Sequence, residues 1–165
     1  TGSFDGDTMG VRLGGGRPMA FSPRAALTPQ LRIDWDRLEQ DGYTESGGSA
    51  LALVVAKRSA DRVRGSVGAQ LDFASDKGDI KVRPYLRGFY HHNFTNDGID
   101  ASASFVSGGG SFVTPGQKPD RNAYSLGAGI NFYSKRSFSA ALAYDGTFGD
   151  SYDSHVFDAR ARWAF

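Results

Sequence analysis

The 165-residue chain carries a formal net charge of +1, has no cysteine and contains 22 glycines. The near-neutral charge argues against a nucleic-acid-binding protein, and the lack of cysteine excludes a disulfide scaffold or a cysteine-ligated zinc site. The length suits one domain. The longest apolar run, residues 50–56, is far shorter than the ~18 residues of a transmembrane helix.

Apolar and polar side chains alternate with a period of two through most of the chain, which is the pattern of β-strands. In chain order, the alternation predicts strands over residues 8–16, 26–36, 49–57, 62–73, 80–92, 99–107, 121–133, 138–148 and 155–165. No segment shows a convincing 3.6-residue period. The sequence therefore predicts an all-β chain of about nine strands, several of them long enough to cross a bilayer, which takes ~9–11 residues.

The polar positions of these strands mix charged residues with glycine, alanine and serine, which favours a crowded, water-filled barrel lumen over the open surface of a soluble domain. We expect twelve charged residues to face the lumen: Arg32, Asp34, Arg62, Arg64, Asp72, Lys81, Arg83, Arg87, Asp145, Asp158, Arg160 and Arg162. We expect the opposite face to contact lipid, or to form the aromatic girdles at its edges, through Trp35, Leu126, Ile130, Phe132, Phe138, Leu142, Tyr144 and Phe148.

The connections between the expected strands alternate in length. Residues 38–48 and 107–120 form long connections, whereas "SKR" at 134–136 is short. Outer-membrane barrels have short periplasmic turns and longer extracellular loops. These features predict an antiparallel up-and-down transmembrane β-barrel in the bacterial outer membrane, with its C-terminus in the periplasm.

Several motifs, in this order, resemble the second half of an autotransporter β-domain, the C-terminal translocator of type V secretion. They include "LTPQLRIDW", "YTESG" with "ALALVV", "RPYLRGFYHHNF", "FVTPGQKPDRNAYSLGAGINF", "LAYDGTFGDSYDSH" and the closing "ARWAF". The resemblance implies a twelve-stranded barrel with a linker helix in its pore, which anchors in the outer membrane and assists export of an N-terminal passenger. It also implies that a signal for the barrel-assembly machinery is formed by Phe157, Ala159, Ala161, Trp163 and Phe165.

Against that family pattern, residues 1–165 are expected to be a partial β-domain. About nine of the twelve strands are present, and the passenger, the linker helix and the first strands are absent. The chain begins at "TGSFDGD" without a methionine, which also suggests a fragment or processed product. The expected partners are outer-membrane lipid, the barrel-assembly machinery, periplasmic chaperones and the protein's own passenger and linker helix, with no nucleic acid and a monomeric state.

Two other functions remain open. A general outer-membrane porin-like barrel would be complete and even-stranded, and a soluble β-barrel would turn the Leu/Phe face inward around a small apolar ligand. An enzymatic barrel would use His91 or Asp97, but adjacent His91 and His92 on one strand point to opposite faces and do not easily share a metal. Self-cleavage of a linker by Asp34 and Asp36 is a minor alternative. We expect no catalytic residues, no metal and no cofactor.

Overall fold

The computed structural model describes residues 3–47, 51–95, 98, 100–116, 118–134 and 137–163. The regular elements among these residues are all β-strands, which confirms the predicted all-β, antiparallel fold class. In this part of the chain, no helix is long and apolar enough to cross a membrane.

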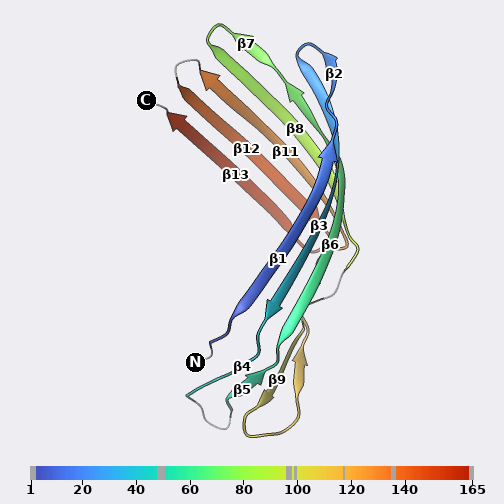
Figure 1. Cartoon of the computed structure of the whole chain (residues 1–165), viewed down its shortest axis with the longest axis vertical. Coiled ribbons are helices and arrows are strands. Elements are labelled where there is room, and N and C mark those ends of the chain that lie inside the picture. Colours follow the sequence, from blue (N-terminus) through green and yellow to red (C-terminus); the bar gives the residue numbers. More distant parts are fainter. Residues whose placement is uncertain are drawn as a thin grey trace. The chain divides into compact units, whose positions relative to one another are not determined.

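The larger sheet is built on seven long strands, which neighbour one another in chain order. Two short strands extend its hairpins: β2 (Met19–Ser22) pairs with β3, and β7 (Ser75–Lys77) pairs with β8. Figure 1 shows the last four long strands side by side. The seven long strands are β1 (Gly6–Gly16), β3 (Ala25–Gln40), β6 (Arg58–Phe73), β8 (Ile80–Asn93), β11 (Asn122–Ser134), β12 (Phe138–Gly149) and β13 (Asp153–Trp163).

A second, four-stranded sheet lies in the two long connections. Its order is β10 (Phe112–Thr114), β9 (Ala101–Phe105), β5 (Leu53–Val55) and β4 (Tyr43–Thr44). This corrects the expectation that residues 49–57 and 99–107 are strands of the barrel wall. Their extended parts are three and five residues long, which is too short to cross a bilayer. Period-two alternation identified these segments as strands but carries no information on their partners.

The seven-strand order changes the assignment of connections to the two ends of the sheet. In an antiparallel sheet, successive connections fall at opposite ends. Residues 41–57, 94–121 and 150–152 therefore belong to one end, and the connections around β2, around β7 and between β11 and β12 belong to the other. The turn at 74–79 lies at the end opposite the long connections, so one end carries the long loops and the other carries short turns.

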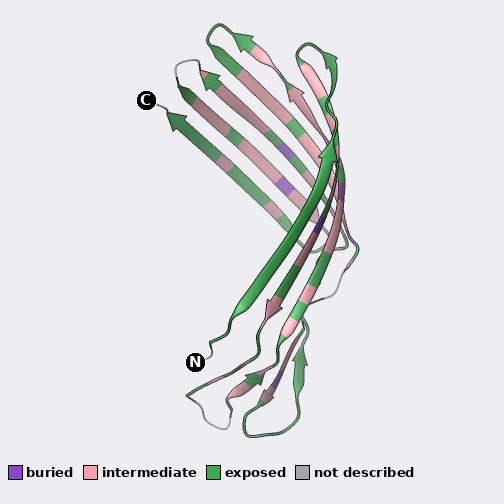
Figure 2. Ribbon diagram, viewed as in Figure 1, coloured by how far each residue is buried: buried purple, intermediate pink, exposed green. Residues whose placement is uncertain are grey.

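The chain divides into two compact units, which are described separately. One comprises residues 1–12, 34–64 and 93–121, and the other comprises residues 13–33, 65–92 and 122–165. Among the described residues, no large side chain is fully buried, and Ala103 is the one buried apolar residue. Figure 2 shows exposed residues along most of β1 and β13. The apolar side chains of this sheet are therefore largely exposed, and the described residues form no extensive buried core.

Candidate functional site: a two-faced sheet

The strand register of the second unit places side chains of the same character beside one another across four strands. Ala128 of β11 is aligned with Leu86 of β8 and with Tyr144 of β12. One residue earlier, Gly127 is aligned with Arg87 and Asp145. Because successive side chains point to opposite faces of a strand, this register separates an apolar face from a polar one.

The polar face of the second unit is centred on Arg87 and Asp145. Arg87 donates from Nε to Asp145 Oδ1 at 2.8 Å and from Nη2 to Oδ2 at 2.6 Å. This two-bond geometry is the strongest that an arginine and a carboxylate form. The pair reaches across β11 at Gly127, where a Cβ would lie 2.3 Å from Asp145 Oδ1. The glycine therefore provides the space for the ion pair.

Aromatic rings lie over glycines on the same face. A Cβ at Gly129 would lie 2.5 Å from the Tyr85 ring, and a Cβ at Gly68 would lie 2.4 Å from Phe89. The Arg87 guanidinium lies 5.8 Å from the Tyr85 ring centre, and the Arg32 guanidinium lies 5.9 Å from that of Phe89. Cations at these distances are attracted to the ring faces.

His91 belongs to this polar face and His92 to the opposite one. The two ring nitrogens of His91 bond the hydroxyls of Ser66 at 2.8 Å and Ser125 at 2.9 Å. His92 Nδ1 lies 2.9 Å from Asn122 Oδ1. His91 thus links three strands, with Ser66 only 4% exposed. This arrangement is a structural polar contact, and Asp97, named with His91 as a candidate acid, lies outside the described residues.

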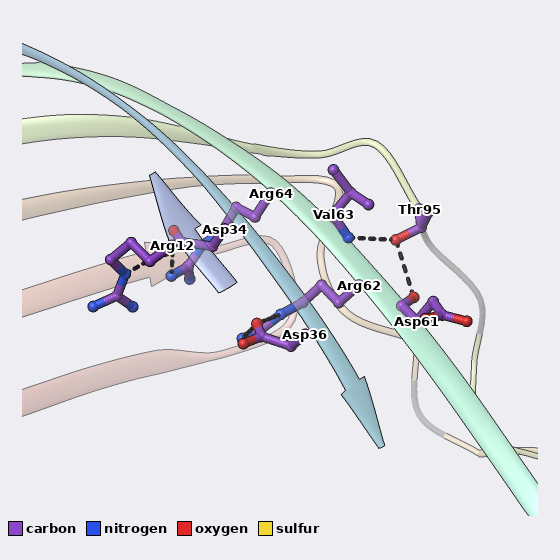
Figure 3. Close-up of polar contacts among 8 residues, drawn as sticks. All are labelled: Arg12, Asp34, Asp36, Asp61, Arg62, Val63, Arg64 and Thr95. Atoms are coloured by element: carbon purple, nitrogen blue, oxygen red, sulfur yellow. Dashed lines mark hydrogen bonds and ion pairs between the residues drawn. The ribbon is translucent and has the colours of Figure 1, made fainter. Parts of the chain in front are cut away.

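The first unit holds a second ionic cluster on its strands, drawn in Figure 3. Asp34 is 2% exposed and forms ion pairs with Arg12 and, at 3.5 Å, with Arg64 Nη2. Asp36 accepts two hydrogen bonds from Arg62, at 3.1 Å from Nε and 2.6 Å from Nη2. A buried carboxylate requires compensating charge. The arginines supply it, so both aspartates have a structural role.

Most of the remaining residues expected on the lumen side have local side-chain partners, and strand register places the other two. Arg83 pairs with Asp76 at 2.6 Å, and Arg160 pairs with Asp158 at 2.8 Å. Asp72 accepts a hydrogen bond from Gln70 at 2.8 Å. Lys81 is aligned with Tyr133, and Arg162 is aligned with Ser139.

The opposite face of the second unit exposes apolar side chains. Phe157 is 79% exposed, Leu126 60% and Leu142 54%. Rings gather toward both ends of the strands. The Phe138 and Trp163 ring centres are 5.6 Å apart, and those of Tyr90 and Tyr124 are 5.4 Å apart. Tyr144 also bonds His155 Nδ1 at 2.8 Å. An apolar band between aromatic rings is typical of a lipid-facing surface.

The other residues expected to face lipid share the parity of the apolar side chains on their own strands. Ile130 and Phe132 follow Leu126 along β11 and are half-buried, as is Trp35 on β3. Phe148 lies on β12 in an edge contact with His155. The described members of the expected assembly signal lie on β13 and are aligned with these β12 residues, while Phe165 lies outside the described residues. The aligned pairs are Phe157 with Tyr144, Ala159 with Leu142, Ala161 with Ala140 and Trp163 with Phe138.

Sequence reasoning missed a network of charges at the long-loop end of the first unit, which we call the outer ion network: Arg37, Glu39, Asp41, Lys57 and Asp61. Arg37 donates to Glu39 at 2.8 Å and pairs with Asp61 at 3.6 Å. Lys57 lies 3.2 Å from Glu39 and 3.4 Å from Asp41. These residues have the same parity as the apolar face of β3 and β6. The signal in the sequence is that charged residues occupy the apolar parity of β3 after Trp35 and the apolar parity of β6 before Val63.

Thr95 fixes the start of the following loop to the same region. Its Oγ1 accepts from the Val63 backbone at 2.8 Å and donates to the Asp61 carbonyl at 3.1 Å (Figure 3). Among the described residues, no group of three or more His, Cys, Asp or Glu side chains is arranged to hold a metal ion.

An antiparallel sheet with one ion-paired face and one exposed apolar face between aromatic rings defines a membrane β-sheet protein. The autotransporter β-domain family model matches residues 1–145, and the chain belongs to this family. The family is one of outer-membrane translocator domains, which places the chain in the bacterial outer membrane. No curated protein matched the chain in a separate comparison.

Proposed function

We propose that this chain assists export of an N-terminal passenger to the cell surface and afterwards anchors it in the outer membrane, without catalysis of its own. The observation that carries the proposal is the alignment of the two faces: Gly127 with Arg87 and Asp145 on one, Ala128 with Leu86 and Tyr144 on the other. One face would contact lipid, and the ion-paired face would line the path of the linker helix and passenger.

The proposal includes an orientation. With the C-terminus in the periplasm, β13 ends there, and the connections at 41–57, 94–121 and 150–152 are at the cell surface. The outer ion network supports a lipid boundary near Trp35 and Val63, because its charges occupy the positions that carry apolar residues further along β3 and β6. The four-stranded sheet would then stand outside the bilayer.

The proposal also includes how the domain reaches the membrane. Periplasmic chaperones would carry the unfolded chain, and the barrel-assembly machinery would bind the two-faced C-terminal segment from Phe157 to Phe165. An extended segment of this kind can pair with the edge of a receptor's sheet.

A surface-display assay tests the export proposal. An epitope-tagged passenger is placed before this chain, with the family's linker and first strands supplied, and antibody labelling of intact cells is compared with total expression. We expect surface labelling, loss of it on Leu142→Arg, and retention on Ala143→Arg. Passenger that stays inside cells whose β-domain is folded in the outer membrane would contradict export while leaving the membrane assignment intact.

Two further tags test the orientation. A tag after Gly109, in the exposed loop between β9 and β10, should be labelled on intact cells. A tag after Gly78, in the turn between β7 and β8, should be labelled only after the outer membrane is permeabilised. The reverse pattern would overturn the proposed orientation.

A further inference from the structure

The apolar face of the second unit contains a depression of about 840 Å³. Its lining includes the large side chains of Phe73, Leu142 and Phe157 and the smaller ones of Pro84, Ala128 and Ala159. Ala128 and Leu142 come from neighbouring strands, β11 and β12, and Ala159 is aligned with Leu142 from β13. The depression therefore arises from a register that places small residues beside large ones across β11, β12 and β13.

The depression lies at the middle of the strands. On β12 it is lined by Leu142 and Tyr144, whereas the ring of Phe138 lies toward one end of that strand and the ring of Phe148 toward the other. Leu142 lies four positions after Phe138, and Phe148 lies four positions after Tyr144, so the two separations along β12 match. If the rings mark the two lipid interfaces, the depression opens at the depth of the acyl chains.

We propose that this depression is a binding site for one acyl chain of an outer-membrane lipid, held there longer than the lipids around it. The inference rests on the proposed function, because it needs this face to contact the bilayer. Its lining is almost entirely apolar. An acyl chain has no hydrogen-bonding group to satisfy, whereas a strand of another protein laid on this face would leave backbone groups unpaired in lipid.

The binding preference comes from packing and not from the hydrophobic effect, because the surrounding lipid is as apolar as the site. In the depression, a chain contacts the small side chains of Ala128 and Ala159 as well as the larger ones of Leu142 and Phe157. Many weak carbon–carbon contacts add up, and we expect a roughly tenfold preference over a lipid on a flat part of the surface.

Photochemical crosslinking tests the proposal in living membranes. Cells that produce the complete protein are fed a fatty acid with a diazirine at mid-chain, irradiated, and the labelled residues of the purified protein are identified by mass spectrometry. We expect strong labelling of Leu142, Phe157 and Ala159, which line the depression. Filling the depression with Ala128→Phe should lower this labelling roughly tenfold.

A matched control adds the same bulk outside the depression: Leu126→Phe should leave the labelling of Leu142 and Phe157 unchanged. Unchanged labelling of Leu142 and Phe157 in Ala128→Phe would overturn the acyl-chain site but keep this face in the bilayer. Labelling of Ala141, which is outside the depression, in place of Leu142 would instead overturn the assignment of faces, and with it the proposed function. Crosslinks from Phe157 to a second copy of the chain would identify a protein occupant and overturn the lipid one.

Discussion

Arg87 of β8 and Asp145 of β12 are joined by two hydrogen bonds of 2.8 and 2.6 Å although β11 lies between their strands. The bridge is possible because the residue beneath it is Gly127, aligned with both. One ion pair thus ties three strands at a single level, in addition to the backbone hydrogen bonds between them.

Gly127→Ala should break this bridge. Its Cβ would lie 2.3 Å from Asp145 Oδ1 and 2.8 Å from Arg87 Nε, so the two side chains must move apart while the backbone stays in place. We expect a loss of about 1–2 kcal/mol in the free energy of unfolding, measured by denaturant titration of the protein in lipid. Gly15→Ala, where the new Cβ meets nothing within 4 Å, is the control and should be neutral. The same loss from Gly127→Ala in an Asp145→Ala background would show that the bridge is not the cause.

Leu142→Arg and Ala143→Arg place the same charge on opposite faces of β12. If Leu142 faces the middle of the bilayer, its replacement should cost about 2–4 kcal/mol. Ala143 is aligned with Asp158, so an arginine there has a carboxylate within reach and should cost much less. Denaturant titration in lipid vesicles measures both. Equal costs at the two positions would contradict the assignment of faces.

The chain has two tryptophans, Trp35 and Trp163, so each can be observed alone by replacing the other with phenylalanine. Both should lie at a lipid interface, where indole rings are favoured. Bromines placed near the lipid headgroup should therefore quench their fluorescence more strongly than bromines near the chain terminus. Stronger quenching from the chain terminus would place that tryptophan within the bilayer, and the proposed boundary at its strand would then be wrong.

Glu39 of the outer ion network, which lies beyond the apolar part of β3, should titrate below its usual range. A hydrogen bond from Arg37, and then one from Lys57, lowers the pKa of its carboxyl group. The stabilisation is present above the unfolded-state pKa and is lost as the pH falls through the lower folded-state pKa. Carboxyl NMR should show the low pKa, with a larger rise on Arg37→Gln than on Lys57→Gln. An unchanged pKa in Arg37→Gln would exclude this hydrogen bond as the main cause.

The sequence pattern predicted the long strands well, because alternation is a local property. Residues 138–148 and 62–73 were expected as strands and form parts of β12 and β6. The partners of shorter segments are not local. The strand at 53–55 pairs with residues 103–105, about fifty positions away. Nothing in the alternation of residues 49–57 distinguishes that pairing from a place in the larger sheet.

The site shows the same limit. The parity of Arg87 and Asp145 could be read from the sequence, but their pairing requires the register of β11 with both neighbours. Arg12, the partner of buried Asp34, lies in a segment with weak alternation and was missed. The outer ion network was missed because charged residues on the apolar parity look like exceptions until Arg37 and Asp61 are seen side by side.

The pairing of β5 with β9 has a consequence for the order in which the chain folds. These two strands flank the β6–β8 hairpin in sequence, so joining them closes a loop that contains the whole hairpin. If the hairpin forms first, only the short connections at 56–57 and 94–100 are left to close. The entropic cost of closing the loop is then smaller, because it grows with the number of flexible residues. The small sheet would then form late, after the hairpin is complete, and its pairing would slow the unfolding of that hairpin.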